Sequence, residues 1–169
     1  EEQHIQNVLS RIKEITKNIV LVDDGSKDKT YELGKSLNVI SLKHVLNLGK
    51  GAALKTGCEF ALQEGAKKMI VIDSDGQHNP EDIPKFVKAL DDNEIVFGYR
   101  VKRESMPFIL RFGNWGINTL SYILFGIKLN DTQCGFRAFT LDAYKKVKWE
   151  TADYFMESEM VALTGKHKL

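Results

Sequence analysis

The chain has 169 residues, which is long enough to bury a substantial core, and we expect one domain spanning residues 1–169. Its 24 Lys and Arg residues nearly balance 23 Asp and Glu residues, and the net charge of +1 argues against nucleic acid as a partner. Two cysteines, Cys58 and Cys134, are too few for a disulfide framework and fit a reducing compartment. The sequence contains no uninterrupted run of about 18 apolar residues, so no membrane-spanning helix is predicted.

Apolar periodicity predicts helices and strands that alternate from the first residue to residue 97. Helices are expected at 1–16, 30–37, 51–63 and 80–90, and strands at 18–22, 39–42, 69–72 and 94–97. Such alternation is typical of an α/β domain, in which a mostly parallel, doubly wound sheet carries helices on both faces.

Two carboxylates follow the apolar strand 69–72 directly. Asp73 and Asp75 are two positions apart, so in an extended segment their side chains point to the same side. Ligands of open α/β sheets bind at these carboxyl strand ends. Together with the amide oxygen of Gln77, the two aspartates make an all-oxygen set that suits Mg²⁺ or Mn²⁺. The alternative is an aspartate-rich turn into the helix that begins at Pro80.

Polar residues also follow the strands 18–22 and 94–97. Asp24 could accept hydrogen bonds from a nucleobase or a ribose, or it could form an Asx turn before the next helix. Arg100 could bind a phosphate through two hydrogen bonds. Lys50 lies between glycines before a predicted helix and could also meet a phosphate, although neither a Walker A nor a Gly-x-Gly-x-x-Gly motif is present.

The segment 106–129 is strongly apolar but carries a narrow polar stripe. Arg111, Asn114 and Asn118 recur at spacings of three and four, which places them on one face of a helix. These polar residues argue against a transmembrane span. The segment is therefore either a core helix or an interfacial helix with Trp115 at the lipid boundary.

Five blocks of sequence, taken in order, resemble the family 2 glycosyltransferases, which have the GT-A fold. The blocks are V-D-D-G-S at 22–26, N-L-G-K-G-A-A-L at 47–54, D-S-D-G-Q-H at 73–78, G-Y-R at 98–100 and D-T-Q-C-G-F-R at 131–137. Within the family they are most similar to the dolichyl-phosphate mannose synthase branch of polyprenyl-phosphate glycosyltransferases.

The resemblance implies roles for the residues at matching positions. Donor binding is expected at Val22, Asp24, Lys50, Asp73, Ser74, Asp75, Gln77 and Arg100. The metal ligands, for Mg²⁺ or Mn²⁺, are expected to be Asp73, Asp75 and Gln77. Acceptor binding is expected at Arg111, Asn114 and Asp131, and direct catalytic roles at Asp75, Arg111 and Arg137.

The resemblance also implies a reaction. The expected enzyme is an inverting, metal-dependent transferase that moves mannose or glucose from GDP-mannose or UDP-glucose to a dolichyl or polyprenyl phosphate. It would lie in the cytoplasm, at the cytoplasmic face of a membrane. A phosphate acceptor is already anionic, whereas a sugar hydroxyl would require a carboxylate base at Glu157, Glu159 or Asp131. Two further classes of protein could use the same residues, namely a non-catalytic nucleotide-sugar-binding domain and a metal-dependent nucleotidyltransferase.

Two departures from the family pattern lead to an expectation about the ends of the chain. The family opens with a strand carrying Pro-x-x-Asn-Glu, whereas this chain opens in the following helix. Family members also continue beyond the glutamate motif matched by Glu157-Ser158-Glu159. We therefore expect a catalytic domain trimmed at both ends.

Overall fold

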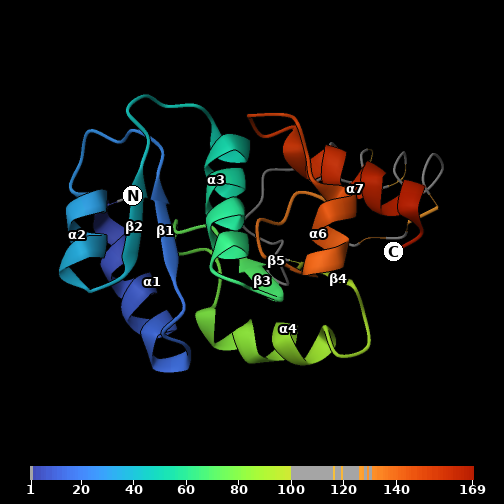
Figure 1. Ribbon diagram of the computed structural model, residues 1–169, viewed down its shortest axis with the longest axis horizontal. Helices are drawn as coiled ribbons and strands as arrows, with labels where there is room; N and C mark the ends of the chain where they lie inside the picture. The colour runs from blue at the N-terminus through green and yellow to red at the C-terminus, as the bar shows by residue number, and fades with distance from the viewer. Residues whose placement is uncertain (1, 100–115, 117–118, 120–125, 128, 130) are drawn as a thin grey trace.

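Helices and strands alternate along the chain in the computed structural model, which describes residues 2–99, 116, 119, 126, 127, 129 and 131–169 (Figure 1). The elements are α1 (Glu2–Ile15), β1 (Val20–Asp23), α2 (Thr30–Ser36), β2 (Ile40–Lys43), α3 (Lys50–Gln63), β3 (Lys68–Val71), the 3₁₀ turn η1 (Pro80–Asp82), α4 (Ile83–Ala89), β4 (Ile95–Phe97), β5 (Arg137–Thr140), α6 (Leu141–Val147) and α7 (Met156–His167). Every element predicted up to residue 97 is confirmed, with ends shifted by a residue or two.

The described strands form two hydrogen-bonded groups. In one, β1 and β2 are parallel, with Val20 opposite Ile40. In the other, β5 lies between β3 and β4 and is antiparallel to both, so that Arg137 is opposite Val71 on one side and Phe97 on the other. The predicted α/β architecture is confirmed, whereas the antiparallel strand β5 was not predicted.

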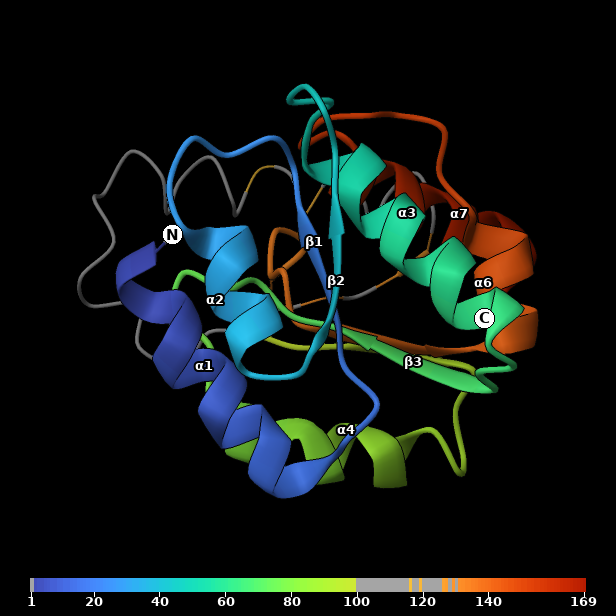
Figure 2. The ribbon, with the colours of Figure 1, turned by 60° about the vertical axis from the view of Figure 1, so that its left-hand side comes forward.

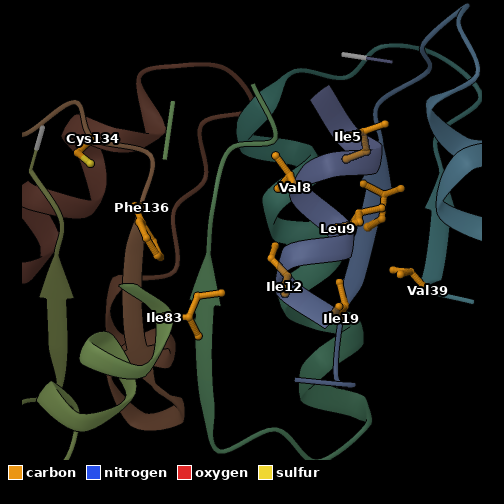
Figure 3. Close-up of a cluster of buried hydrophobic side chains, with 10 residues drawn as sticks. Ile5, Val8, Leu9, Ile12, Ile19, Val39, Ile83, Cys134 and Phe136 are labelled. Atoms are coloured by element: carbon orange, nitrogen blue, oxygen red, sulfur yellow. The ribbon is translucent and has the colours of Figure 1, made fainter. Parts of the chain in front are cut away.

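A first core lies between the sheet and α1. The apolar residues of α1 recur at helical spacing and are buried with residues from β1, α4 and the segment before β5 (Figure 3). The members of this cluster are Ile5, Val8, Leu9, Ile12, Ile19, Leu21, Val39, Ile83, Cys134 and Phe136. Figure 2 shows α1 and α2 together on this side of the molecule, with α4 below them.

A second core lies between the sheet and α3, α6 and α7. Its buried members are Cys58, Met69, Val71, Phe139, Ala143, Tyr144, Val147, Trp149, Met156 and Met160. Along β3 the side chains alternate, because Met69 and Val71 belong to this cluster while Ile70 packs against the first one. The sheet is therefore covered by helices on both faces.

Two further expectations can be compared with the structure. Cys58 and Cys134 are both free and buried, and burial raises the pKa of the Cys58 thiol to about 12. Within the described residues, no helix has the length and apolar character needed to cross a bilayer. Most of the segment 106–129, where an interfacial helix is predicted, lies outside the described residues.

Candidate active site

Three charged side chains from distant parts of the chain meet where β3 ends. Lys50, at the first position of α3, donates hydrogen bonds to Asp73 Oδ2 at 2.7 Å and to Glu157 Oε1 of α7 at 2.8 Å. Glu157 is 4% exposed, whereas Asp73 and Lys50 are only partly buried. Burial alone would lower the pKa of Lys50, but the two carboxylates outweigh it and raise that pKa, so the lysine is a cation.

Glycines allow the N-terminus of α3 to approach the segment before α7. A Cβ on Gly51 would lie 2.3 Å from the carbonyl oxygen of Thr151, and one on Gly49, whose φ is 97°, would lie 2.5 Å from that of Ala152. Trp149 Nε1 donates to the carbonyl of Gly51 at 2.8 Å. The close backbone approach explains the Gly-Lys-Gly sequence and directs Lys50 toward Glu157.

A third glycine belongs to the block at 131–137. A Cβ on Gly135 would lie 2.0 Å from Asp73 Oδ2, so only glycine leaves room for the aspartate in this position. The segment before β5 therefore forms one wall of the site. The resemblance placed this block on the acceptor side, and the structure places its glycine directly against Asp73.

Asp24, a predicted donor contact, is bonded to the protein itself. Its Oδ1 accepts from the backbone N–H of Leu48 at 2.9 Å, and its Oδ2 accepts from that of Gly49 at 2.8 Å. His44 Nδ1 lies 2.7 Å from Asp24 Oδ1, and its Nε2 lies 2.9 Å from Thr56 Oγ1. Asp24 thus anchors the loop that carries Lys50, and its role as a nucleoside contact stays a prediction.

These bonds also set the ionisation of Asp24. Burial alone would raise the pKa of its carboxyl group, but the hydrogen bonds from Leu48, His44 and Gly49 outweigh burial and lower that pKa. Next to it, the buried Asp23 accepts from the backbone N–H of Ser26 at 2.7 Å and lies 3.4 Å from Lys43 Nζ. Both aspartates at the end of β1 are therefore engaged in holding loops.

The other predicted donor residues lie at or near the strand ends. Val22 packs against α3, where a Cβ on Gly57 would lie 3.1 Å from its Cγ2 atom. Ser74 is half-buried, and Gln77 is exposed. Asp75 is half-buried and accepts from the backbone N–H of Gln77 at 2.9 Å, so it forms a local aspartate turn of the kind expected as the alternative to a metal site.

The predicted metal ligands fit a divalent ion only in part. Among the described residues, no group of three or more His, Cys, Asp and Glu side chains could hold a metal. Asp73 is paired with Lys50, which leaves the Asp75 carboxylate as the better placed ligand. Mg²⁺ and Mn²⁺ are commonly held by one or two carboxylates together with substrate phosphates, and the residues are compatible with that arrangement.

Arg137, predicted to be catalytic, is enclosed by the protein. The side chain is 1% exposed, and it donates to the carbonyl oxygens of Cys134 at 2.9 Å and Thr132 at 2.8 Å. Its guanidinium also stacks over Phe97 and reaches the carbonyl of Glu157. The arginine therefore joins β5 to α7 and is not presented to a ligand in this arrangement, and its catalytic role stays a prediction.

The three candidate base carboxylates are all engaged. Glu157 is paired with Lys50, and Asp131 is 2% exposed and accepts from the backbone N–H of Gln133. Glu159 accepts from the backbone N–H groups of Glu150 and Thr151 and from the Thr151 hydroxyl. Burial alone would raise the pKa of Glu159, but these hydrogen bonds lower it.

Some site residues were missed, and some predicted ones cannot be placed. Arg100, Arg111 and Asn114 lie outside the described residues. His44 was not predicted, because nothing in the neighbouring sequence distinguishes a loop histidine that binds a distant aspartate from one that is exposed to solvent. Trp149 was not predicted either, although an isolated tryptophan near a predicted site is a usable signal for a hydrogen-bonded core position.

The α/β fold is the one expected of a GT-A glycosyltransferase, and comparisons with known proteins agree. Residues 1–148 match the family described as Glycosyl transferase family 2, and the chain belongs to this family. It is 40% identical over 178 aligned positions to an uncharacterized protein of Methanocaldococcus jannaschii, covering all of this chain and 73% of that protein.

Other relatives carry functional names. The chain is 34% identical to the UDP-N-acetylglucosamine–dolichyl-phosphate N-acetylglucosaminyltransferase of Methanococcus voltae, covering all of this chain and 78% of that protein. Glucosyl-3-phosphoglycerate synthase from Mycobacterium tuberculosis, crystallised with Mn²⁺, UDP-glucose and phosphoglyceric acid, superposes with a TM-score of 0.76 at 20% identity. That alignment covers 99% of this chain and 62% of the solved one, so the chain spans less than two thirds of the enzyme it resembles in fold.

Proposed function

We propose that this protein is an inverting glycosyltransferase that moves a hexose, mannose or glucose, from a nucleotide-diphosphate sugar to a dolichyl or polyprenyl phosphate. The proposed donors are GDP-mannose and UDP-glucose, and the proposed cofactor is Mg²⁺ or Mn²⁺. The class of reaction is supported by family membership and by relatives named for dolichyl-phosphate and polyprenyl-phosphate transfer.

The choice of acceptor depends on the hydrogen bonds and ion pairs that the three candidate base carboxylates already make. A sugar hydroxyl must lose its proton as it attacks, and this requires a carboxylate within hydrogen-bond reach. Glu157, Glu159 and Asp131 are each bonded to the protein. A phosphate monoester is already anionic at neutral pH, so it can attack without any of these carboxylates. This favours a lipid phosphate over a hydroxyl acceptor.

The donor side must offset the negative charge that develops on the leaving diphosphate. Asp75 would hold the divalent ion, which when bound supplies positive charge to the diphosphate. Lys50 uses two of its three N–H donors on Asp73 and Glu157, and the third can bind a donor phosphate while both pairs are kept. The wall formed by Gly135 would hold Asp73 in place and keep the sugar aligned with the acceptor.

A membrane-bound acceptor places the protein at a membrane surface, and we propose peripheral attachment at the cytoplasmic face. Arg111 and Asn114 are proposed to hold the acceptor phosphate. Replacing Arg111 with Ala should reduce transfer to polyprenyl phosphate by about tenfold or more while donor binding is retained, because charge-assisted contacts are worth roughly 1.5–3 kcal/mol. Normal transfer by this variant would place the acceptor site elsewhere.

The function is tested with a panel of donors and acceptors. The protein is incubated with GDP-mannose, UDP-glucose or UDP-N-acetylglucosamine and a short-chain polyprenyl phosphate, with Mn²⁺ or with a chelator. We expect transfer to the phosphate, none to the matching polyprenol, and loss on chelation. Transfer to the alcohol would contradict the acceptor, and donor binding with no transfer to any acceptor would leave a non-catalytic binding domain.

A further inference from the structure

Two loops at one end of the molecule expose large apolar side chains. In the loop that follows β2, Val45 is 97% exposed and Leu46 is 70% exposed, and Leu48 is exposed as well. In the loop before α7, Tyr154 and Phe155 are 72% and 73% exposed. We call these five residues the apolar rim. Apolar side chains at this exposure on adjacent loops mark an interaction surface.

The two loops of the rim are in direct contact with each other. The backbone N–H of Ala52 donates to the carbonyl of Ala152 at 3.0 Å, and Gly49 and Gly51 pack on the same segment. In both Figure 1 and Figure 2 the loop after β2 and the loop before α7 lie at the same end of the molecule. The two loops of the rim are therefore joined where Gly49 packs on Ala152, at the same end of the molecule.

The rim borders the candidate active site. Lys50 Nζ lies 5.9 Å from the centroid of the Tyr154 ring, and the same nitrogen is bonded to Asp73 and Glu157. Glu157 itself lies only two positions beyond Phe155. Any surface that covers the rim is thus held close to the reacting groups.

We propose that the apolar rim docks this protein on the surface of a lipid bilayer, with its side chains among the lipid headgroups and upper acyl chains. The proposal rests on the proposed function, because a polyprenyl phosphate keeps its tail in the bilayer and offers only its phosphate to the enzyme. If the apolar rim inserts into the bilayer, the active site beside it can bind that phosphate while the lipid tail stays in the membrane.

The chemistry of the rim suits a bilayer better than a protein partner. Its members lie on loop tips, and Figure 2 shows the loop after β2 extending beyond the neighbouring helices, which is a shape for insertion and not for a flat interface. Tyr154 is an amphipathic aromatic residue of the kind enriched at membrane interfaces. The apolar rim would therefore meet a bilayer through its aliphatic and aromatic side chains, whereas the Nζ atom of Lys43, just before the first loop, lies 3.4 Å from Asp23 Oδ2.

The test measures binding to phosphatidylcholine vesicles with and without phosphatidylserine. The variant Val45→Ser/Leu46→Ser removes two exposed side chains, and Phe155→Ser alters the second loop independently. A matched control, Ile40→Ser/Val87→Ser, changes two exposed apolar residues outside the rim. We expect vesicle affinity to fall by about tenfold or more in each rim variant, because each removes apolar surface that would be buried in the bilayer. The control should bind like the original protein.

Each outcome bears on one proposal only. Transfer to a short-chain, water-soluble acceptor should be unchanged in the Val45→Ser/Leu46→Ser variant, since neither side chain contacts the charged cluster. Vesicle binding that is absent in the original protein, or equal in the rim variants, overturns the docking surface. Loss of a dimer in the rim variants by light scattering, with vesicle binding unchanged, would assign the rim to a second copy. Absence of transfer to every acceptor would instead overturn the proposed function.

Discussion

Two strands, β1 and β3, each end in aspartates, and the surroundings of the two ends differ. At the end of β1, Asp24 accepts hydrogen bonds from Leu48 and Gly49 and lies against His44, so its carboxylate is used within the protein. At the end of β3, Asp73 faces a lysine, and Asp75 accepts a single backbone bond from Gln77.

The difference separates a scaffold from a binding site. A carboxylate surrounded by backbone N–H groups stabilises one conformation of a loop, whereas the Asp75 carboxylate, which accepts one backbone hydrogen bond, has acceptor capacity left for a ligand. Replacement of residues at the first end should therefore alter folding stability, and replacement of Asp75 should alter ligand binding.

Removal of the lysine gives the largest expected effect on stability. Lys50→Met leaves Glu157 buried without its cation, and we expect the free energy of unfolding to fall by about 3 kcal/mol, the lower end of the cost of breaking a buried pair. Urea denaturation measures this loss. The matched control is Lys85→Met, which breaks the exposed pair with Asp82 and should cost less than about 1 kcal/mol. Equal losses in the two variants would mean that the cluster at β3 is no tighter than a surface pair.

The wall beside Asp73 is expected to matter nearly as much. Gly135→Ala introduces a methyl group where Asp73 lies, and we expect a loss of about 2–3 kcal/mol from overpacking. Transfer should fall by about a hundredfold, the cost of misplacing a reacting group by about 1 Å. Gly116→Ala, at a position with no described heavy atom within 4 Å of the added methyl group, is the control for stability. An unaffected Gly135→Ala enzyme would show that the wall is not needed.

Loss of the loop anchor at β1 should have a smaller effect, and one that depends on pH. Asp24→Ala should lower the free energy of unfolding by about 1–2 kcal/mol at pH 7, because backbone N–H groups lose their acceptor. Since the pKa of Asp24 is lowered in the folded state, its contribution is present above the ordinary value of about 3.9 and is lost as pH falls through the folded-state pKa.

The pH dependence provides the control for this prediction. The stability difference between the original protein and Asp24→Ala should therefore shrink as the solution is made more acidic. Asp91→Ala, which removes an exposed partner of Lys68, should show a small difference at every pH. If Asp24→Ala is fully stable and loses only nucleoside affinity, Asp24 acts as a donor contact and the contrast between the strand ends fails.

Asp75 should give the smallest effect on stability and a clear one on ligand binding. We expect Asp75→Asn to change the free energy of unfolding by less than about 0.5 kcal/mol, as for other replacements away from the core. Its Mn²⁺-dependent affinity for a nucleoside diphosphate should fall by about tenfold or more, since an oxygen-coordinated ion loses a charged ligand. Calorimetry with and without Mn²⁺ measures this effect, and unchanged affinity would remove Asp75 from the metal site.

The local pattern of the sequence predicted most of the fold up to β4. The apolar spacing of α1 and the short apolar runs of β1 and β3 depend on neighbours in sequence, and each was placed within a residue or two. β5 was missed because its first residue is an arginine, which interrupts the apolar pattern of a buried strand. Only the folded chain supplies the carbonyl groups that make burial of Arg137 possible.

The site could be predicted only in part for a related reason. The place of Asp73 and Asp75 just after β3 follows from the apolar run that precedes them, and glycines beside Lys50 indicate that two backbone segments approach closely there. The partners of these residues come from segments far away, as with Gly135 against Asp73 and Glu157 against Lys50. Spacing along the chain carries no information about such contacts, so the pairing of Lys50 with Asp73 and Glu157 was not predicted.

The bond between Lys50 and Glu157 has a further meaning for how the protein folds. It joins residues 107 positions apart. Contacts of such separation form late, because the entropy cost of closing a long loop comes before the contact contributes any favourable energy. A growing chain on the ribosome can pair β1 with β2 and form α3 well before residue 157 has been made. The charge cluster closes only when α7 docks on the second core, so the nascent protein holds no assembled site until its last described helix is in place.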